Sequence, residues 1–178
     1  MEMGMGEDKG PLAVEDGIDT FSGGGVMVML ETIAGERPKF IYAGPEIERA
    51  DASQLKALST WQYVHGSASQ DRALSLSNEL STGTLAPSGL IASRDGKDWA
   101  IDLRVEEVRV LDASAATIRC VDEHSRVAAT YTLRINPIAG VLTTSTQIEN
   151  LGDAELAVGS EEPVERLFAD RADGQPQT

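Results

Sequence analysis

The clearest structural signal in the chain is the sequence Val127-Ala128-Ala129-Thr130-Tyr131-Thr132-Leu133-Arg134-Ile135. Apolar side chains occupy every second position, and threonine or arginine fills most of the positions between them. Successive side chains of a β-strand point to opposite faces of its sheet. This period of two therefore predicts a strand with one buried face and one face toward water.

The segment that precedes this strand shows the same period with one interruption. Its apolar positions are Trp99, Ile101, Leu103 and Val105, and after Glu106-Glu107 they resume with the other parity at Val108 and Val110. A strand that changes the parity of its buried face needs one extra residue. We therefore predict a β-bulge at Glu106-Glu107, and this explains the adjacent carboxylates better than a catalytic pair does.

Further strands are predicted on both sides of this region. Residues 141–149 and 155–158 read as strands, and turn residues separate the segments at 95–96, 122–124, 136–137 and 150–153. No helices alternate with these strands. The pattern predicts a mainly β fold, an antiparallel β-sandwich.

The N-terminal half adds shorter elements. Residues 26–30 and 38–45 are predicted strands, and residues 51–61 form the only good helical stretch, so we expect one or two short helices. The ends of the chain lose all periodicity. The expected organisation is a flexible acidic tail at residues 1–19, a β-sandwich domain at 20–160, and a flexible tail or the start of a linker at 161–178.

The chain is strongly acidic, with 15 Lys and Arg residues against 29 Asp and Glu residues and a net charge of −14. Nucleic acid requires clustered basic residues, and anionic membranes attract basic segments, so we expect neither partner. The N-terminus lacks the basic and apolar regions of a signal peptide, and no apolar stretch reaches the roughly 18 residues that span a bilayer. A cytoplasmic location is the resulting expectation.

Residues with catalytic or ligand-binding chemistry are scarce, and we expect no cofactor and no metal. The glycines of residues 22–25 precede a strand and lack a following Gly-Lys-Ser/Thr, so they do not indicate phosphate binding. His65 and His124 show no paired metal-ligand spacing, and His124 lies in a predicted turn. Cys120 lies in an apolar run and is interpreted as a small core residue.

Aromatic side chains are the remaining candidates, because a ring can stack on the apolar face of a sugar. Trp61, Tyr63 and His65 cluster near a predicted loop and are candidate carbohydrate-binding residues. Trp99 and Tyr131 lie at apolar positions of their predicted strands, so we assign both to the core.

Three tracts of the chain also follow one another in a recognisable order. They are Phe40-Ile41-Tyr42-Ala43-Gly44-Pro45-Glu46-Ile47; then Leu76-Ser77-Asn78-Glu79-Leu80-Ser81-Thr82-Gly83, Ala86-Pro87-Ser88-Gly89-Leu90 and Arg94-Asp95-Gly96-Lys97-Asp98-Trp99; then Tyr131-Thr132-Leu133, Val141-Leu142 and Thr146-Gln147-Ile148-Glu149-Asn150-Leu151-Gly152-Asp153. Together they resemble the N-terminal β-sandwich domain of glycoside hydrolase family 36, which includes bacterial α-galactosidases. The resemblance departs from the family at Ala43, where the family has tryptophan.

This resemblance implies a supersandwich-like domain without catalytic residues of its own. In the family, the sandwich precedes a (β/α)8 barrel that carries the aspartates of a retaining mechanism, so this chain alone is expected to be inactive. The implied partners are that catalytic barrel, further copies in a homo-oligomer, and galactosides. Two alternatives remain open: an independent carbohydrate-binding module, and a hydrolase with its own carboxylate site.

Overall fold

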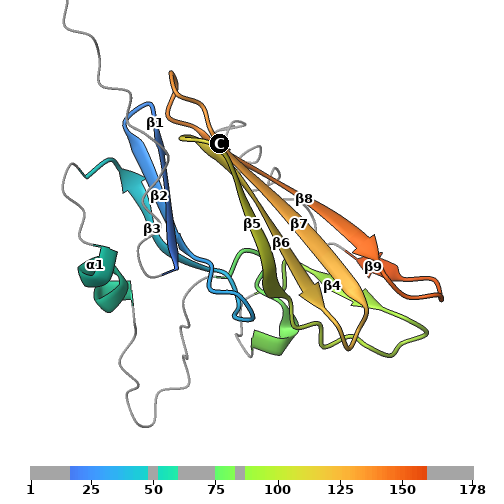
Figure 1. The fold of residues 1–178 in the computed structure, drawn as a ribbon. Coiled ribbons are helices and arrows are strands. Elements are labelled where there is room, and N and C mark those ends of the chain that lie inside the picture. Colours follow the sequence, from blue (N-terminus) through green and yellow to red (C-terminus); the bar gives the residue numbers. More distant parts are fainter. Residues whose placement is uncertain (1–16, 48–51, 60–74, 83–86, 160–178) are drawn as a thin grey trace, which may run out of the picture.

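The computed structural model describes residues 17–47, 52–59, 75–82 and 87–159, and its regular structure consists almost entirely of β-strands (Figure 1). All strand pairs are antiparallel, which confirms the predicted fold class. Three sheets are present in the described residues. A three-stranded sheet contains β1 (Ile18–Gly23), β2 (Val26–Glu31) and β3 (Lys39–Pro45), a two-stranded sheet contains β4 (Ile91–Ser93) and β9 (Ala157–Gly159), and a four-stranded sheet contains β5 (Arg104–Asp112), β6 (Ala115–Asp122), β7 (Val127–Ile135) and β8 (Leu142–Asn150). The same residues include one α-helix, α1 (Ala52–Ser59), and a 3-10 turn, η1 (Leu80–Thr82).

The predicted central strand is β7, which pairs with β8 along its whole length and with β6 from Val127 to Arg134, in both cases without a register shift. Its alternate residues Val127, Ala129, Tyr131, Leu133 and Ile135 are all at most 4% exposed. On the other face Thr130 and Thr132 are partly buried and Arg134 is exposed. The period of two is therefore confirmed as one core face and one wetter face.

The predicted bulge is also confirmed. Val105 of β5 pairs with Cys120 of β6, whereas Glu107 pairs with the adjacent Arg119, which leaves Glu106 as the extra residue. Glu106 and Glu107 form separate ion pairs, with Arg119 at 2.7 Å and with Arg109 at 2.8 Å. The two carboxylates are therefore part of the surface charge pattern of the sheet.

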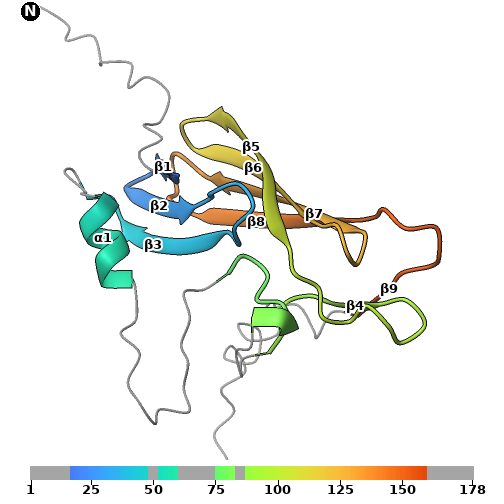
Figure 2. The ribbon, with the colours of Figure 1, turned by 60° about the horizontal axis from the view of Figure 1, so that its bottom comes forward.

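The three-stranded sheet lies beside one face of the four-stranded sheet, as Figures 1 and 2 show. Phe21, Val28 and Leu30 belong to the same buried cluster as Ile118 and Leu133 from the larger sheet. Burying side chains of this size contributes roughly 1.5–3 kcal/mol each, so this interface between the two sheets makes a large contribution to stability.

Strand β2 is buried on both faces. Its other face contributes Met27 and Met29 to a second cluster with Ile18, against which Tyr42 and Leu55 pack. Leu55 belongs to α1, which lies on this side of the small sheet (Figure 2). The double burial explains why residues 26–30 read as a continuous apolar run.

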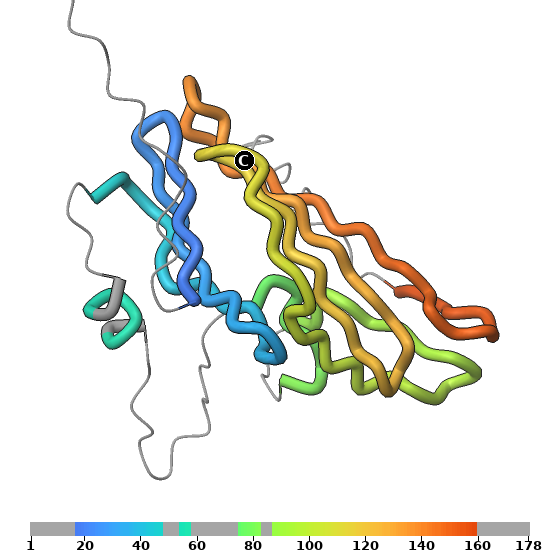
Figure 3. Tube along the Cα trace, viewed as in Figure 1, coloured from blue at the N-terminus to red at the C-terminus, as the bar shows by residue number. Residues whose placement is uncertain are grey.

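The glycines of residues 22–25 form the tight turn between β1 and β2. Gly24 has a φ of 59°, a left-handed conformation, and a Cβ placed there would collide with the backbone of Gly140. Figure 3 shows the β1–β2 turn lying close to the β7–β8 turn that contains Gly140. Gly24 is therefore required for close backbone packing between the two sheets.

Trp99 contradicts its assignment to the core, because 58% of its surface is exposed. The strand β5 starts only at Arg104, and among the described residues no strand pairs with 98–103, so no sheet imposes alternation on this segment. Ile101 and Leu103 are nevertheless buried at 1% and 0%.

The domain begins slightly earlier than the sequence indicated. Strand β1 starts at Ile18, so residues 18 and 19, which we placed in the N-terminal tail, belong to a sheet and are buried. The assignments of residues 1–16 and 160–178 lie outside the described residues. Within the described part of the chain, no helix has the length and apolar character to cross a membrane.

Candidate functional site

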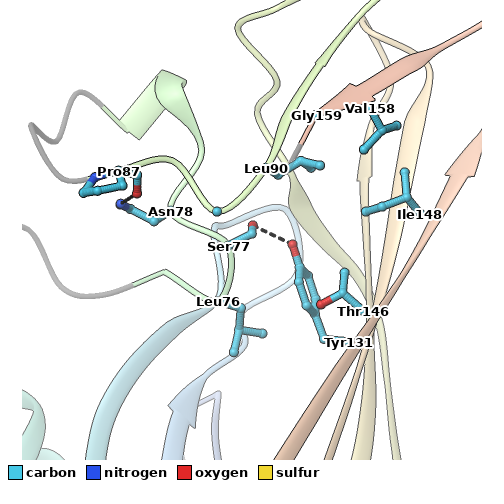
Figure 4. Close-up of a pocket in the computed structure, with 11 residues that line it drawn as sticks. Leu76, Ser77, Asn78, Pro87, Leu90, Tyr131, Thr146, Ile148, Val158 and Gly159 are labelled. Atoms are coloured by element: carbon cyan, nitrogen blue, oxygen red, sulfur yellow. Dashed lines mark hydrogen bonds between the residues drawn. The ribbon is translucent and has the colours of Figure 1, made fainter. Parts of the chain in front are cut away.

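An open pocket of about 320 Å³ lies on the inner face of the four-stranded sheet, near its β8 side (Figure 4). This volume is at the lower end of the range for small-molecule sites. Tyr131 of β7 and Thr146 and Ile148 of β8 form one side. The other lining residues come from β9 and from the segments before β4: Val158, Gly159, Leu76, Ser77, Asn78, Pro87, Gly89 and Leu90.

A hydrogen-bonded chain of polar groups runs from the pocket wall into the core. The Tyr131 hydroxyl donates to Ser77 Oγ at 2.6 Å (Figure 4). Ser77 Oγ donates in turn to Glu79 Oε1, and Ser75 Oγ donates to Glu79 Oε2 at 3.3 Å. Glu79 is only 1% exposed. The network fastens the segment 75–79 to the centre of β7.

Burial sets the protonation of the two titratable groups near this carboxylate. Burial raises the pKa of the Cys120 thiol to about 12, and the charge of Glu79 adds to the effect. Burial also raises the pKa of Tyr131 well above its usual value; the bond to Ser77 opposes this and the charge of Glu79 reinforces it. Cys120 is therefore an inert thiol at neutral pH, as predicted, and Tyr131 is a hydrogen-bond donor.

This arrangement is suited to packing or binding and not to hydrolysis. No carboxylate or imidazole is among the residues that line the pocket, whereas glycoside hydrolysis requires two carboxyl groups across the bond. Tyr131 and Ser77 already use their hydroxyl protons within the network. Across the described ranges, no group of three or more His, Cys, Asp or Glu side chains could hold a metal ion.

A second cavity of about 500 Å³ is richer in charge, but three of its four carboxylates, those of Asp102, Glu106 and Asp122, have structural partners. Asp102 accepts hydrogen bonds from Arg37 Nε at 2.6 Å and from Arg104 Nη2 at 2.7 Å. Burial alone would raise the pKa of Asp102, but the two arginines outweigh it and hold the pKa below its usual value. Asp122 Oδ1 accepts from the backbone of His124 at 2.9 Å, and so fixes the turn in which His124 is exposed, as predicted.

Arg94 connects β4 to two turns of the large sheet, and the sequence analysis did not identify it. Its Nη1 donates to the carbonyl of Ser125, and its Nη2 donates to the carbonyl of Arg126 at 2.8 Å and to Asn150 Oδ1 at 2.6 Å. The structure thus joins two of the tracts that carry the family resemblance. Their wide separation in sequence gave no signal of this contact.

The candidate carbohydrate-binding residues Trp61, Tyr63 and His65 lie outside the described residues. Of the remaining aromatic candidates, Tyr131 is buried at 4% exposure, as assigned, and Trp99 is at the surface. Glu79 was quoted in one of the family-like tracts but was not recognised as a buried group. Only its position between two leucines, Leu76 and Leu80, indicated in the sequence that this glutamate could be buried.

The two packed antiparallel sheets define a β-sandwich domain. The family model described as "Glycosyl hydrolase family 36 N-terminal domain" matches residues 36–169, which is more than half of the chain. The chain belongs to this family. A comparison with curated proteins found no match.

Solved structures of larger enzymes share the fold. The galactosidase domain of the α-galactosidase–sucrose kinase AgaSK matches 83% of this chain at 16% identity and a TM-score of 0.64. The α-galactosidase AgaA from Geobacillus stearothermophilus matches 79% at 14% identity and a TM-score of 0.62, and the Lactobacillus brevis α-galactosidase matches 79% at 11% identity and a TM-score of 0.64. The matched region is only 24%, 23% and 22% of those chains.

Proposed function

We propose that this chain is the non-catalytic N-terminal module of an α-galactosidase-like glycoside hydrolase. In this role it packs against a catalytic (β/α)8 barrel and takes part in oligomer assembly. The observation that carries the proposal is the family match over residues 36–169, together with the small share of the similar enzymes that the chain spans.

The surface offers an apolar patch that suits docking of another domain. Val110 and Leu111 of β5 are 40% and 51% exposed, and Ile138 and Val141 of the β7–β8 turn are 93% and 55% exposed. Strand pairing places both groups at one end of the four-stranded sheet. We call these four residues the hairpin-end patch. Exposed apolar side chains at one site are typical of contact surfaces.

A chimeric enzyme tests this role. The chain would replace the corresponding segment of the Lactobacillus brevis α-galactosidase, and hydrolysis of p-nitrophenyl α-D-galactoside would be measured. We expect an active chimera, no hydrolysis by the chain alone, and at least a tenfold loss of chimera activity in the double variant Leu111→Asp, Ile138→Asp because a buried charge opposes docking.

The matched control for this double variant is Ala154→Asp, at an exposed position that follows β8 at the opposite end of the four-stranded sheet, which should leave the chimera active. Hydrolysis of the substrate by the isolated chain would refute a non-catalytic role. Equal activity of the double variant and the control would refute docking through the hairpin-end patch.

A second candidate function is carbohydrate binding, and the exposure of Trp99 favours it. An exposed indole can stack on the apolar face of a pyranose. Titration with galactose, melibiose and raffinose, followed by tryptophan fluorescence, would test it in single variants of the two tryptophans. A saturable change that is lost in Trp99→Ala or Trp61→Ala supports a binding module, and no change in the unaltered chain refutes it.

A further inference from the structure

The two edge strands of the four-stranded sheet, β5 and β8, differ in how well they are protected against pairing with a strand of another molecule. Strand β5 has five charged residues in nine, and the bulge at Glu106 interrupts its ladder. The backbone of Val105 is also covered, since it accepts a hydrogen bond from Gly35 and donates one to Glu36, both at 2.9 Å. Charges, bulges and covering loops are the features that prevent one edge strand from pairing with another.

Strand β8 has none of these features. Its pairing with β7 continues from Leu142 to Asn150 without a register shift, so the edge is long and regular. Its sequence Leu-Thr-Thr-Ser-Thr-Gln-Ile-Glu-Asn has one charged residue and no proline, and its threonines favour extended structure. Among the described residues no strand pairs with its outer edge, and residues 143–147 are all exposed.

The inner face of β8 is incompletely covered as well. Tyr131 and Leu133 of β7 are 4% and 2% exposed, whereas their partners Thr146 and Thr144 in β8 are exposed. The pocket described above opens at this boundary, beside Thr146 and Ile148. An added strand at the β8 edge would therefore continue both the backbone ladder and the half-covered inner face.

We propose that β8 pairs with β8 of a second copy of this chain, antiparallel and centred on Thr146. The inference rests on the assembly role proposed above and identifies the surface that performs it. A two-fold axis at Thr146 places Thr146 opposite itself, Thr144 opposite Ile148, and Leu142 opposite Asn150. All of these residues have even numbers and lie on the inner face of β8. Antiparallel pairing centred on Thr146 places even-numbered residues opposite even-numbered residues, so the inner faces of the two copies lie on the same side of the joined sheet.

The charges of the strand are compatible with this pairing. The single charge, Glu149, forms an ion pair with Arg119 at 2.8 Å on the same chain. In the proposed register the two Glu149 residues are six residue steps apart, or about 20 Å, which exceeds the screening length of roughly 8–10 Å in physiological salt. The region 142–148 is uncharged in a chain of net charge −14, so no like charges within it oppose the approach of a second copy.

The proposal is tested by sedimentation equilibrium of the full chain and of two variants of the central residue. The unaltered chain should form a dimer of twice the 19.0 kDa chain mass, and raising the salt concentration should tighten it by screening the net charge. Thr146→Lys and Thr146→Glu each place like charges opposite one another and should weaken self-association at least tenfold. A mixture of the two variants should restore a dimer that contains one copy of each.

Ala113→Lys is the matched control, because it adds the same charge at an exposed turn away from β8 and should leave the dimer unchanged. Thermal unfolding of each variant shows whether it is folded, and restoration in the mixture excludes misfolding as the cause. A monomeric unaltered chain, dimers that persist in Thr146→Lys, or variants that do not restore one another overturn the proposal.

Hydrogen exchange separates a second copy from other occupants. Protection of the β8 amides should rise with protein concentration. Protection that is independent of concentration shows that the edge is covered within one chain, and this overturns self-pairing. Thr146 is not part of the hairpin-end patch, so an active chimera alongside a monomeric chain would reject the dimer and leave the docking role intact.

Discussion

Two glutamates of this domain are almost completely buried, and they are stabilised in opposite ways. Glu31 of β2 is 5% exposed and forms ion pairs with Lys39, at 3.0 Å, and with Lys56 of α1. Glu79 is 1% exposed and accepts hydrogen bonds from the hydroxyls of Ser75 and Ser77. No lysine or arginine in the described part of the chain pairs with Glu79.

The difference shows what each carboxylate does. A buried carboxylate is costly unless hydrogen bonds and opposite charges compensate for lost water. Glu31 lies where partly exposed lysines reach it, and it links the helix to the small sheet. Glu79 lies beside Tyr131 and Cys120 in the core; burial is the main cause that raises the pKa of both groups, and the charge of Glu79 adds to it. It organises the segment that forms the pocket wall, so its loss should affect the structure more.

The largest effect is expected from Glu79→Ala. The substitution leaves a cavity and removes the acceptor for two partly buried hydroxyls, so it should lower the free energy of unfolding by about 3 kcal/mol. Urea unfolding followed by circular dichroism measures this loss. Glu123→Ala, at an exposed turn position, is the control and should change stability by less than about 0.5 kcal/mol. Equal losses in the two variants would contradict the structural role of Glu79.

Alkaline unfolding tests whether the core around Glu79 holds the Cys120 thiol and the Tyr131 hydroxyl in their protonated forms. The pKa of Cys120 rises from 9.0 to about 12 on folding, and that of Tyr131 also rises. Their stabilisation is complete below their unfolded pKa values and is lost as pH rises toward the folded values. Each group should lower the free energy of unfolding by about 1.4 kcal/mol per pH unit within its window.

Urea unfolding between pH 7 and pH 11 shows this slope, and Cys120→Ala should reduce it. Glu79→Gln should reduce it by less, since burial is the larger cause of both raised pKa values and the substitution removes only the contribution of the charge while keeping the size of the side chain. An alkaline slope that is the same in the unaltered chain and in Cys120→Ala would show that the thiol is not held protonated by the fold.

The sequence predicted the large sheet well because one physical rule, alternation across a pleated sheet, controls it. The strand of residues 127–135 and the bulge at Glu106 both follow from the parity of apolar positions. Trp99 followed the same parity and is exposed, whereas Ile101 and Leu103 in the same unpaired segment are buried. Periodicity alone therefore does not determine burial outside a paired strand.

The buried polar network could not be predicted in the same way. Ser77 and Tyr131 are 54 positions apart, and only the packing of the segment 75–79 against β7 brings their hydroxyls together. The same applies to Arg94 and Asn150, which are 56 positions apart. The residues of both contacts lie within the tracts that resemble family 36. The resemblance therefore included these residues, but it did not indicate which of them contact one another.

A smaller loss is expected from Tyr131→Phe, which removes only the hydroxyl at the start of the network. Ser77 still donates to Glu79, so the cost is one hydrogen bond, about 1 kcal/mol in the same urea experiment. Tyr42→Phe is the matched control, because its hydroxyl donates to the carbonyl of Pro45 at 2.7 Å at an exposed site. We expect a loss of less than half as much there, and the reverse order would contradict the network.

Glu31→Gln should cost about 1 kcal/mol at neutral pH, because its lysines are partly exposed and solvent screens the pairs. Burial would raise the pKa of Glu31, but Lys56 and Lys39 outweigh it and lower the pKa below 4.5. This stabilisation is present above the unfolded pKa and is lost as pH falls through the folded one. The stability difference between the two proteins should therefore shrink below about pH 4. A constant difference down to pH 3 would refute the ion pairs.

The smallest effects are expected from removing the lysines one at a time. Lys39 and Lys56 have side chains that are 37% and 41% exposed, so Lys39→Met and Lys56→Met should each cost about 0.5 kcal/mol or less. Only Lys56 lies on α1, so only its loss should speed hydrogen exchange of the helix amides. Faster exchange in both variants would mean that α1 is destabilised when Glu31 loses either ion pair, and not only when it loses the pair with Lys56. Faster exchange in neither would mean that Leu55, packed against Met27 and Met29, holds the helix without the ion pair.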